Sequence, residues 1–156
     1  MKVNIEESMY AEKAMALFKQ GFNCAQAVFV AFEDKYNIDR KTALMLSSSF
    51  GGGMGRLREV CGAVSGMFMV AGLLYGYYDP DDYEKKKSHY KRIQHLAEEF
   101  KLINGSIVCR ELLNLNTKTD SPSPEKRTTT YYQKRPCVQL VGLAAAIMEQ
   151  YILNNS

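Results

Sequence analysis

The chain has 156 residues, 46% of them hydrophobic, and a formal net charge of only +3 at pH 7. A chain of this length buries roughly 70% of the surface that its unfolded form exposes, which predicts one independent domain over residues 1–156. The small charge, with no basic run beyond Lys85, Lys86 and Lys87, argues against nucleic acid as a partner.

The first third of the chain predicts helices, and few stretches have strand character. Apolar residues lie near one helical face over 3–20. Asn23 can cap a second helix, expected over 24–35. Asp39 can cap a third, expected over 39–49. The N-terminus enters charged residues without a secretory signal, so we expect a cytoplasmic, bacterial-type protein in a reducing compartment.

Residues 47–76 form the most unusual stretch of the chain. The sequence GGGMG at 51–55 precedes Cys61, and the 17 residues from Val60 to Gly76 carry no charge. Dense glycine before a helix indicates backbone that turns sharply or approaches another group closely. The uncharged run is shorter than the roughly 20 residues that span a bilayer. We therefore expect a buried central helix over about 59–75, not a transmembrane one.

The second half of the chain predicts a long helix, a polar loop and a final helix. Apolar residues repeat at helical spacing down to Asn104, and CRELL at Cys109 fits a short helix. Residues 114–134 are polar, carry two prolines and predict a long surface loop. Pro136 suits the first position of the last helix. The expected fold is an all-α, single-domain helical bundle of about five longer helices plus one short helix.

Four cysteines are the candidate chemical groups: Cys24, Cys61, Cys109 and Cys137. Their spacing fits neither a zinc ribbon nor a CxxC pair, but each falls in the first turn of a predicted helix. A helix N-terminus favours a thiolate, which predicts lowered cysteine pKa values. Arg58, Arg110 and Arg135 lie within three residues of the last three cysteines and would add to this effect. The alternative is that the cysteines are small core residues.

The sequence around these cysteines resembles the C_GCAxxG_C_C family of redox-active proteins. The hallmark of that family is a CGAxxG segment with one cysteine before it and two after it. Here CGAVSG occupies 61–66, and the resemblance runs from about residue 8 to residue 150. The resemblance implies a redox role and a functional link to a transporter. It extends to the split-Soret cytochromes, but no CxxCH site is present, so covalent c-type haem is not expected.

Gly62 and Gly66 stand four residues apart on the expected central helix. Small residues on one helical face let another helix approach closely, or give a cofactor access beside Cys61. The two interpretations are compatible, so Gly62 and Gly66 are candidate cofactor-binding residues. The GGGMG loop lacks the pattern of a phosphate-binding loop, and we expect it to turn the chain so that Cys61 is presented at a helix start.

The leading interpretation is a cysteine-dependent redox protein with an unidentified redox partner. Its four cysteines, with Cys61 at the centre, would converge at helix N-termini and cycle between dithiol and disulfide. In one alternative the same four thiolates, Cys24, Cys61, Cys109 and Cys137, bind a metal such as zinc or an iron–sulfur cluster. In another, the protein is a non-catalytic interaction module with structural cysteines that serves a partner or a homodimer. Oxidoreductase activity is one of these outcomes, and the sequence leaves the choice open.

Overall fold

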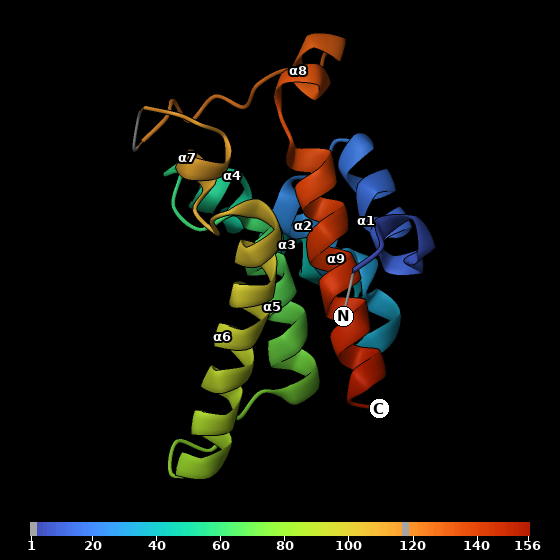
Figure 1. The fold of residues 1–156 in the computed structure, drawn as a ribbon, viewed down its shortest axis with the longest axis vertical. Helices are drawn as coiled ribbons and strands as arrows, with labels where there is room; N and C mark the ends of the chain where they lie inside the picture. Colours follow the sequence, from blue (N-terminus) through green and yellow to red (C-terminus); the bar gives the residue numbers. More distant parts are fainter. Residues whose placement is uncertain (1–2, 117–118) are drawn as a thin grey trace.

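The computed structural model describes residues 3–116 and 119–156, and it confirms the predicted all-α fold (Figure 1). The helices of eight or more residues in this part of the chain are α1 (Met9–Lys19), α2 (Cys24–Ala31), α3 (Arg40–Ser47), α5 (Gly62–Tyr75), α6 (Tyr83–Asn104) and α9 (Cys137–Asn154). The shorter ones are η1 (Ile5–Glu7), η2 (Glu33–Lys35), η3 (Ser48–Phe50), α4 (Gly51–Met54), α7 (Cys109–Leu112) and α8 (Thr129–Lys134). Within the described ranges, β-structure is limited to one isolated bridge, between Val60 and Val108.

Several helices begin where short polar side chains cap them, among them α1, α2, α3 and α6. Asn23 forms a capping box with Gln26 at the start of α2, as its position before that helix predicted. Asp39 likewise accepts a hydrogen bond from the Thr42 N–H at the start of α3. The helix ends differ more from expectation. The second helix stops at Ala31 because the next residues tighten into the 3₁₀ turn η2.

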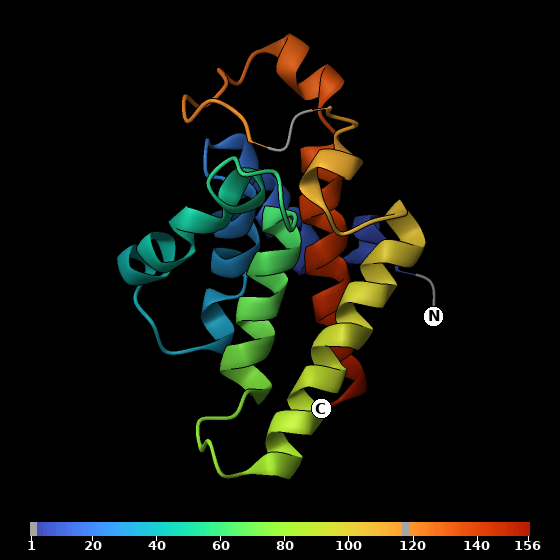
Figure 2. The same cartoon turned by 90° about the vertical axis from the view of Figure 1, so that its left-hand side faces the viewer.

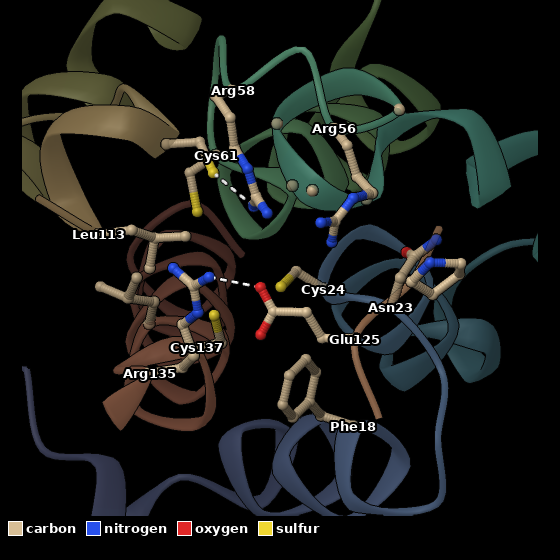
Figure 3. Close-up of a pocket in the computed structure, with 18 of the residues that line it drawn as sticks. Phe18, Asn23, Cys24, Arg56, Arg58, Cys61, Leu113, Glu125, Arg135 and Cys137 are labelled. Atoms are coloured by element: carbon tan, nitrogen blue, oxygen red, sulfur yellow. Dashed lines mark hydrogen bonds and ion pairs between the residues drawn. The ribbon is translucent and has the colours of Figure 1, made fainter. Parts of the chain in front are cut away.

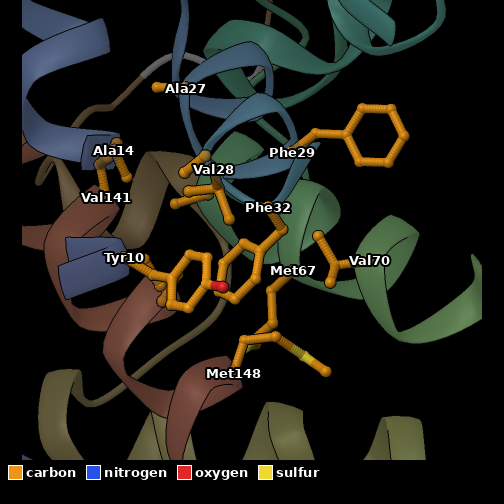
Figure 4. Packing of buried hydrophobic residues seen from close by; sticks show 14 of the residues in the cluster. Tyr10, Ala14, Ala27, Val28, Phe29, Phe32, Met67, Val70, Val141 and Met148 are labelled. Atoms are coloured by element: carbon orange, nitrogen blue, oxygen red, sulfur yellow. The ribbon is translucent and has the colours of Figure 1, made fainter. Parts of the chain in front are cut away.

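The four helices α1, α2, α5 and α9 pack around one core, and α6 packs along α5 and α9 (Figure 2). At the centre of the core, the Tyr10 ring stacks on Phe32 with 4.3 Å between ring centroids, and Met67 and Met148 are fully buried nearby (Figure 4). The expected central helix therefore forms as α5. By length and composition α9 is the one described helix that could cross a membrane, and half of that stretch is buried within the fold.

Close contact between α5 and α2 depends on glycine. A Cβ atom at Gly66 would lie 2.8 Å from the carbonyl oxygen of Ala25 and 3.0 Å from the Cβ of Val28. Both distances are too short for carbon, so a side chain at residue 66 would force the two helices apart. At Gly66 the structure therefore confirms the interpretation that small residues allow close helix packing.

The segment 114–134 differs from a plain surface loop at its end, where α8 forms. The Thr128 hydroxyl caps α8 by accepting from the N–H of Tyr131, in a stretch whose polar composition gave no helical pattern. Arg127 fastens the segment to α1, because its guanidinium lies 3.9 Å from the Phe18 ring centroid and donates to the carbonyls of Phe18 and Phe22. In both views the segment from 119 to 134 crosses the end of the bundle at which α9 begins (Figures 1 and 2).

Candidate functional site

A cavity of about 320 Å³ lies at the end of the bundle beneath this segment, and all four cysteines line it (Figure 3). Cys24, Cys109 and Cys137 are the first residues of α2, α7 and α9, and Cys61 directly precedes α5. The predicted placement of the four thiols at helix starts is therefore confirmed. A cavity of this size suits a small molecule.

The glycine loop forms one wall of the cavity and contacts Cys109 rather than only Cys61. Gly53 has a φ of +68°, and a Cβ atom there would lie 2.5 Å from the Cβ of Cys109. Three residues with side chains in the same loop, Met54, Arg56 and Arg58, also have left-handed backbone, with φ of +69°, +68° and +58°. Residues other than glycine adopt this conformation at a cost of about 1 kcal/mol or more each. The loop holds both arginines against this strain, and their side chains line the cavity.

Backbone hydrogen bonds hold Cys61 and Cys109 on adjacent segments. The N–H of Cys61 donates to the carbonyl of Ile107 over 2.8 Å, and the N–H of Cys109 donates to the carbonyl of Glu59 over 2.5 Å. These bonds explain why α5 begins at Gly62 and not at residue 59 as expected, since residues 59–61 pair with the chain before α7. The same bonds place Cys61 and Cys109 next to each other at the cavity wall.

Cys24 and Cys137 form the most specialised pair in the cavity. The interaction between the two thiols raises the pKa of Cys24 and lowers the pKa of Cys137 to about 7. A hydrogen bond from the Tyr131 hydroxyl and the positive charges of Arg135 and Arg127 lower the Cys137 pKa further, against the opposing effect of burial. Cys137 is therefore about half thiolate near neutral pH.

The other two cysteines are favoured as neutral thiols. Burial raises the pKa of Cys61 to about 12, although the N–H groups of Ala63 and Val64 favour the thiolate. Burial also raises the pKa of Cys109, although Arg58 Nη1 lies 3.6 Å from its Sγ. The expectation of a lowered pKa is thus wrong for three of the four cysteines. Removal from water outweighs the helix terminus at Cys61 and Cys109, whereas the interaction with Cys137, followed by burial, raises the pKa of Cys24. Cys61 does not have the environment of a reactive thiol.

The arginines near the cysteines in sequence act on different partners in space. Arg58 contacts Cys109 and not Cys61. Arg110 turns away and pairs with Glu59 at 3.2 Å. Only Arg135, of these three arginines, acts on its neighbour in sequence, because its charge lowers the pKa of Cys137.

Residues in the segment expected to be a loop also line the cavity. Tyr131 and Arg127 act on the Cys137 sulfur, and Glu125 accepts from Arg135 over 2.5 Å. Sequence reasoning missed all three, because a polar segment with prolines gives no spacing that relates it to a distant cysteine. The two adjacent tyrosines before RPC were the one local signal.

The cysteines share a cavity without forming a recognisable metal site. Within residues 3–116 and 119–156, no group of three or more His, Cys, Asp or Glu side chains is arranged to hold a metal ion. The four thiols are free, with no disulfide among them. Gly62 lines the cavity beside Cys24, where a Cβ atom would lie 3.1 Å from the Cys24 Cβ, whereas Gly66 lies outside the lining.

Comparison with known proteins agrees with this arrangement. The model of the family described as "Putative redox-active protein (C_GCAxxG_C_C)" matches residues 22–151, a range that contains every cysteine and the whole cavity lining except Phe18. Comparison with curated proteins gave no match, and comparison with solved structures gave none either. The family model covers far more than half of the chain, and the protein therefore belongs to the C_GCAxxG_C_C family.

Proposed function

We propose that the cavity is a thiol–disulfide oxidoreductase site in which Cys137 is the attacking thiolate and Cys24 the resolving thiol. The observation that carries the proposal is the placement of both thiols on the lining of one small-molecule cavity, where the interaction between them favours the Cys137 thiolate. A thiol attacks a disulfide best when its pKa lies near the ambient pH, a condition that Cys137 meets. The partner thiol, Cys24, is partly exposed and close enough to complete the reaction.

The reaction takes two steps and balances with a disulfide as the oxidant. The Cys137 thiolate attacks one sulfur of a substrate disulfide, which forms a mixed disulfide and breaks the substrate S–S bond. The leaving thiolate takes up the proton of Cys24. The Cys24 thiolate then attacks the Cys137 sulfur, forms the Cys24–Cys137 disulfide and releases the second substrate thiol after protonation. The protein loses two electrons and the substrate gains them, and an external dithiol reverses the change.

Cys61 and Cys109 have a supporting role in this proposal. Both stay protonated near neutral pH, so they react slowly with disulfides. A reducing cytoplasm, the compartment expected from the sequence, is where cysteines that are not structural bridges serve catalysis or sensing. No contact among the described residues favours the metal-binding or interaction-module alternative over this one.

Peptide mapping after controlled oxidation tests the proposal. The fully reduced protein is treated with a stoichiometric amount of 2-hydroxyethyl disulfide, blocked with an alkylating reagent at low pH and digested. We expect the Cys24–Cys137 disulfide to form first, and Cys61 and Cys109 to be recovered alkylated. In the matched variants, Cys137→Ser blocks oxidation and Cys109→Ser leaves it unchanged. A first disulfide that contains Cys61 or Cys109, or four thiols that never pair, would reject this assignment.

A further inference from the structure

We infer that the substrate of this cavity is a small acidic disulfide or thiol, and that Arg58 and Arg56 bind its acidic group. The inference rests on the proposed function and names the substrate class for the same site. The first observation concerns Arg58, whose side chain is only 5% exposed. Its Nε is the one buried side-chain polar atom in the described part of the chain that has no hydrogen-bond partner. Buried guanidinium groups in proteins are normally satisfied, so the described residues leave the hydrogen-bonding capacity of Arg58 incompletely used.

The direction of the two side chains agrees with such a ligand. Figure 3 shows the guanidinium groups of Arg56 and Arg58 directed from the glycine loop into the cavity. The Arg58 guanidinium has five N–H groups. Its Nη1 donates to the Cys109 sulfur and its Nη2 donates to Asp120. Both arginines therefore keep donors available for an anion that enters the cavity.

The charge of the lining favours an acidic ligand as well. Arg56, Arg58, Arg127 and Arg135 line the cavity, and Glu125 is the one carboxylate among the lining residues. Asp120 already shows that this pair of arginines binds a carboxylate, since its Oδ2 lies 3.0 Å from Arg58 Nη2 and 3.2 Å from Arg56 Nη2. Guanidinium groups bind carboxylates through short, charge-assisted hydrogen bonds, so the donors of this pair that Asp120 does not occupy suit a second acid.

The size of the cavity limits the substrate to a small molecule. A volume of about 320 Å³ holds a compound of roughly the size of a dipeptide, not a folded protein segment. The acidic group at Arg58 and the reactive sulfur at Cys137 would then lie at opposite sides of one short molecule. Positive charge at the acidic end also stabilises the extra negative charge that builds up on sulfur during thiolate attack.

Three disulfides of similar size and different charge test the inference. Dithiodiglycolate is a dianion, 2-hydroxyethyl disulfide is neutral and cystamine is a dication. The rate of Cys137 oxidation is measured at one ionic strength and divided by the rate of a free small thiol with the same reagent. We expect a normalised rate for the dianion about tenfold or more above that of the neutral compound, with the dication slowest.

Variants assign the preference to the arginines. Arg56→Gln is expected to remove most of the preference for the dianion, measured as the ratio of the normalised rates with the dianionic and the neutral disulfide. Arg40→Gln makes the same change of net charge at a site that is 53% exposed and forms no part of the cavity. It is expected to retain the preference. Equal normalised rates in the wild type, or a preference that survives Arg56→Gln, would overturn the inference.

A binding measurement separates this inference from the redox proposal. Thiodiglycolate carries the same two carboxylates but has a thioether in place of the disulfide, so it binds without reacting. Calorimetry is expected to show saturable binding to the reduced wild type and about tenfold weaker binding to Arg56→Gln. If thiodiglycolate binds but no disulfide oxidises the protein, the redox proposal fails and the anion site stands. If it does not bind, the inference is wrong whatever the redox result.

Discussion

The hydroxyl of Tyr131, on α8, donates a hydrogen bond to the sulfur of Cys137, the first residue of α9. This contact connects the segment that covers the cavity with the thiol that the cavity activates. A donor to the thiolate stabilises the charged form, so Tyr131 lowers the Cys137 pKa. Burial, followed by the negative charge of Cys137, raises the pKa of Tyr131 and keeps its hydroxyl protonated.

Removing this hydroxyl should make Cys137 less acidic. Tyr131→Phe is expected to raise the Cys137 pKa from about 7 by roughly one unit, the size expected for one hydrogen bond to a charged group. The pH dependence of alkylation by iodoacetamide measures the shift. Tyr132→Phe is the matched control, because the Tyr132 ring packs edge-on against Phe18 and not on the sulfur. Identical alkylation profiles for the wild type and Tyr131→Phe would contradict the role of this hydroxyl.

The Cys24 thiol can be tested separately as a hydrogen-bond donor and as a resolving thiol. Cys24→Ala removes both functions, so the Cys137 pKa should rise toward the ordinary value of about 8.5 and no internal disulfide should form. Cys24→Ser keeps an O–H donor, so the pKa should stay near that of the wild type while the disulfide is still lost. Alkylation profiles give the first quantity, and mass spectrometry of the oxidised protein gives the second. A Cys137 pKa near 8.5 in both variants would show that the donor is not what lowers it.

The sequence carried enough information to predict the class of fold and the position of each cysteine along its helix. Caps such as Asn23 and Asp39 are local signals, and a cysteine that follows a cap or a proline lies at a helix start wherever that helix packs. The helix ends were less predictable. Whether residues after Ala31 continue as α-helix or tighten into a 3₁₀ turn depends on tertiary packing.

The electrostatics of the site could not be predicted in the same way. Arg58 is three residues from Cys61 yet contacts Cys109, because the left-handed backbone of the loop turns its side chain toward α7. Cys61 follows the most distinctive motif of the chain, but its depth in the core raises its pKa. Burial and long-range contacts of this kind appear only in three dimensions, and they decide which thiol is reactive.

The ion pair of Asp120 with the glycine-loop arginines predicts a pH-dependent contribution to stability. The Arg58 side chain, a backbone N–H and Arg56 hold the Asp120 pKa below its usual range. A depressed pKa of this kind contributes stability that is fully present above the unfolded value of about 3.9 and is lost as the pH falls through the folded value. Asp120→Asn should therefore lower the melting temperature at pH 6–7, and the difference from the wild type should shrink toward zero in strong acid.

Thermal unfolding followed by circular dichroism from neutral pH down into strong acid measures this difference. Glu33→Gln is the matched control, because the Glu33 carboxylate pairs with the exposed Arg40 instead of with the glycine loop. It should leave the melting temperature nearly unchanged at every pH. A difference between Asp120→Asn and the wild type that stays constant into strong acid would rule out the ion pair as its source.

Two glycines of α5 offer a test of the contact between α5 and α2. At Gly66 a Cβ atom would meet the backbone oxygen of Ala25 at 2.8 Å, an atom that cannot move without shifting α2. At Gly72, in the same helix, a Cβ atom would meet nothing within 4 Å. Gly66→Ala should destabilise the fold by about 1–3 kcal/mol through overpacking. Gly72→Ala should stabilise it by about 0.5–1 kcal/mol, because alanine loses less conformational entropy in a helix.

The free energy of unfolding in urea distinguishes these outcomes. Because α2 also carries Cys24, the shift that Gly66→Ala forces on α2 should separate Cys24 from Cys137 and raise the Cys137 pKa as well. Gly72→Ala, far along α5 from the cavity, should leave that pKa unchanged. Equal stabilisation by both substitutions would mean that α5 and α2 are not in close contact at Gly66. A destabilised Gly66→Ala with an unchanged Cys137 pKa would mean that the shift of α2 does not reach Cys24.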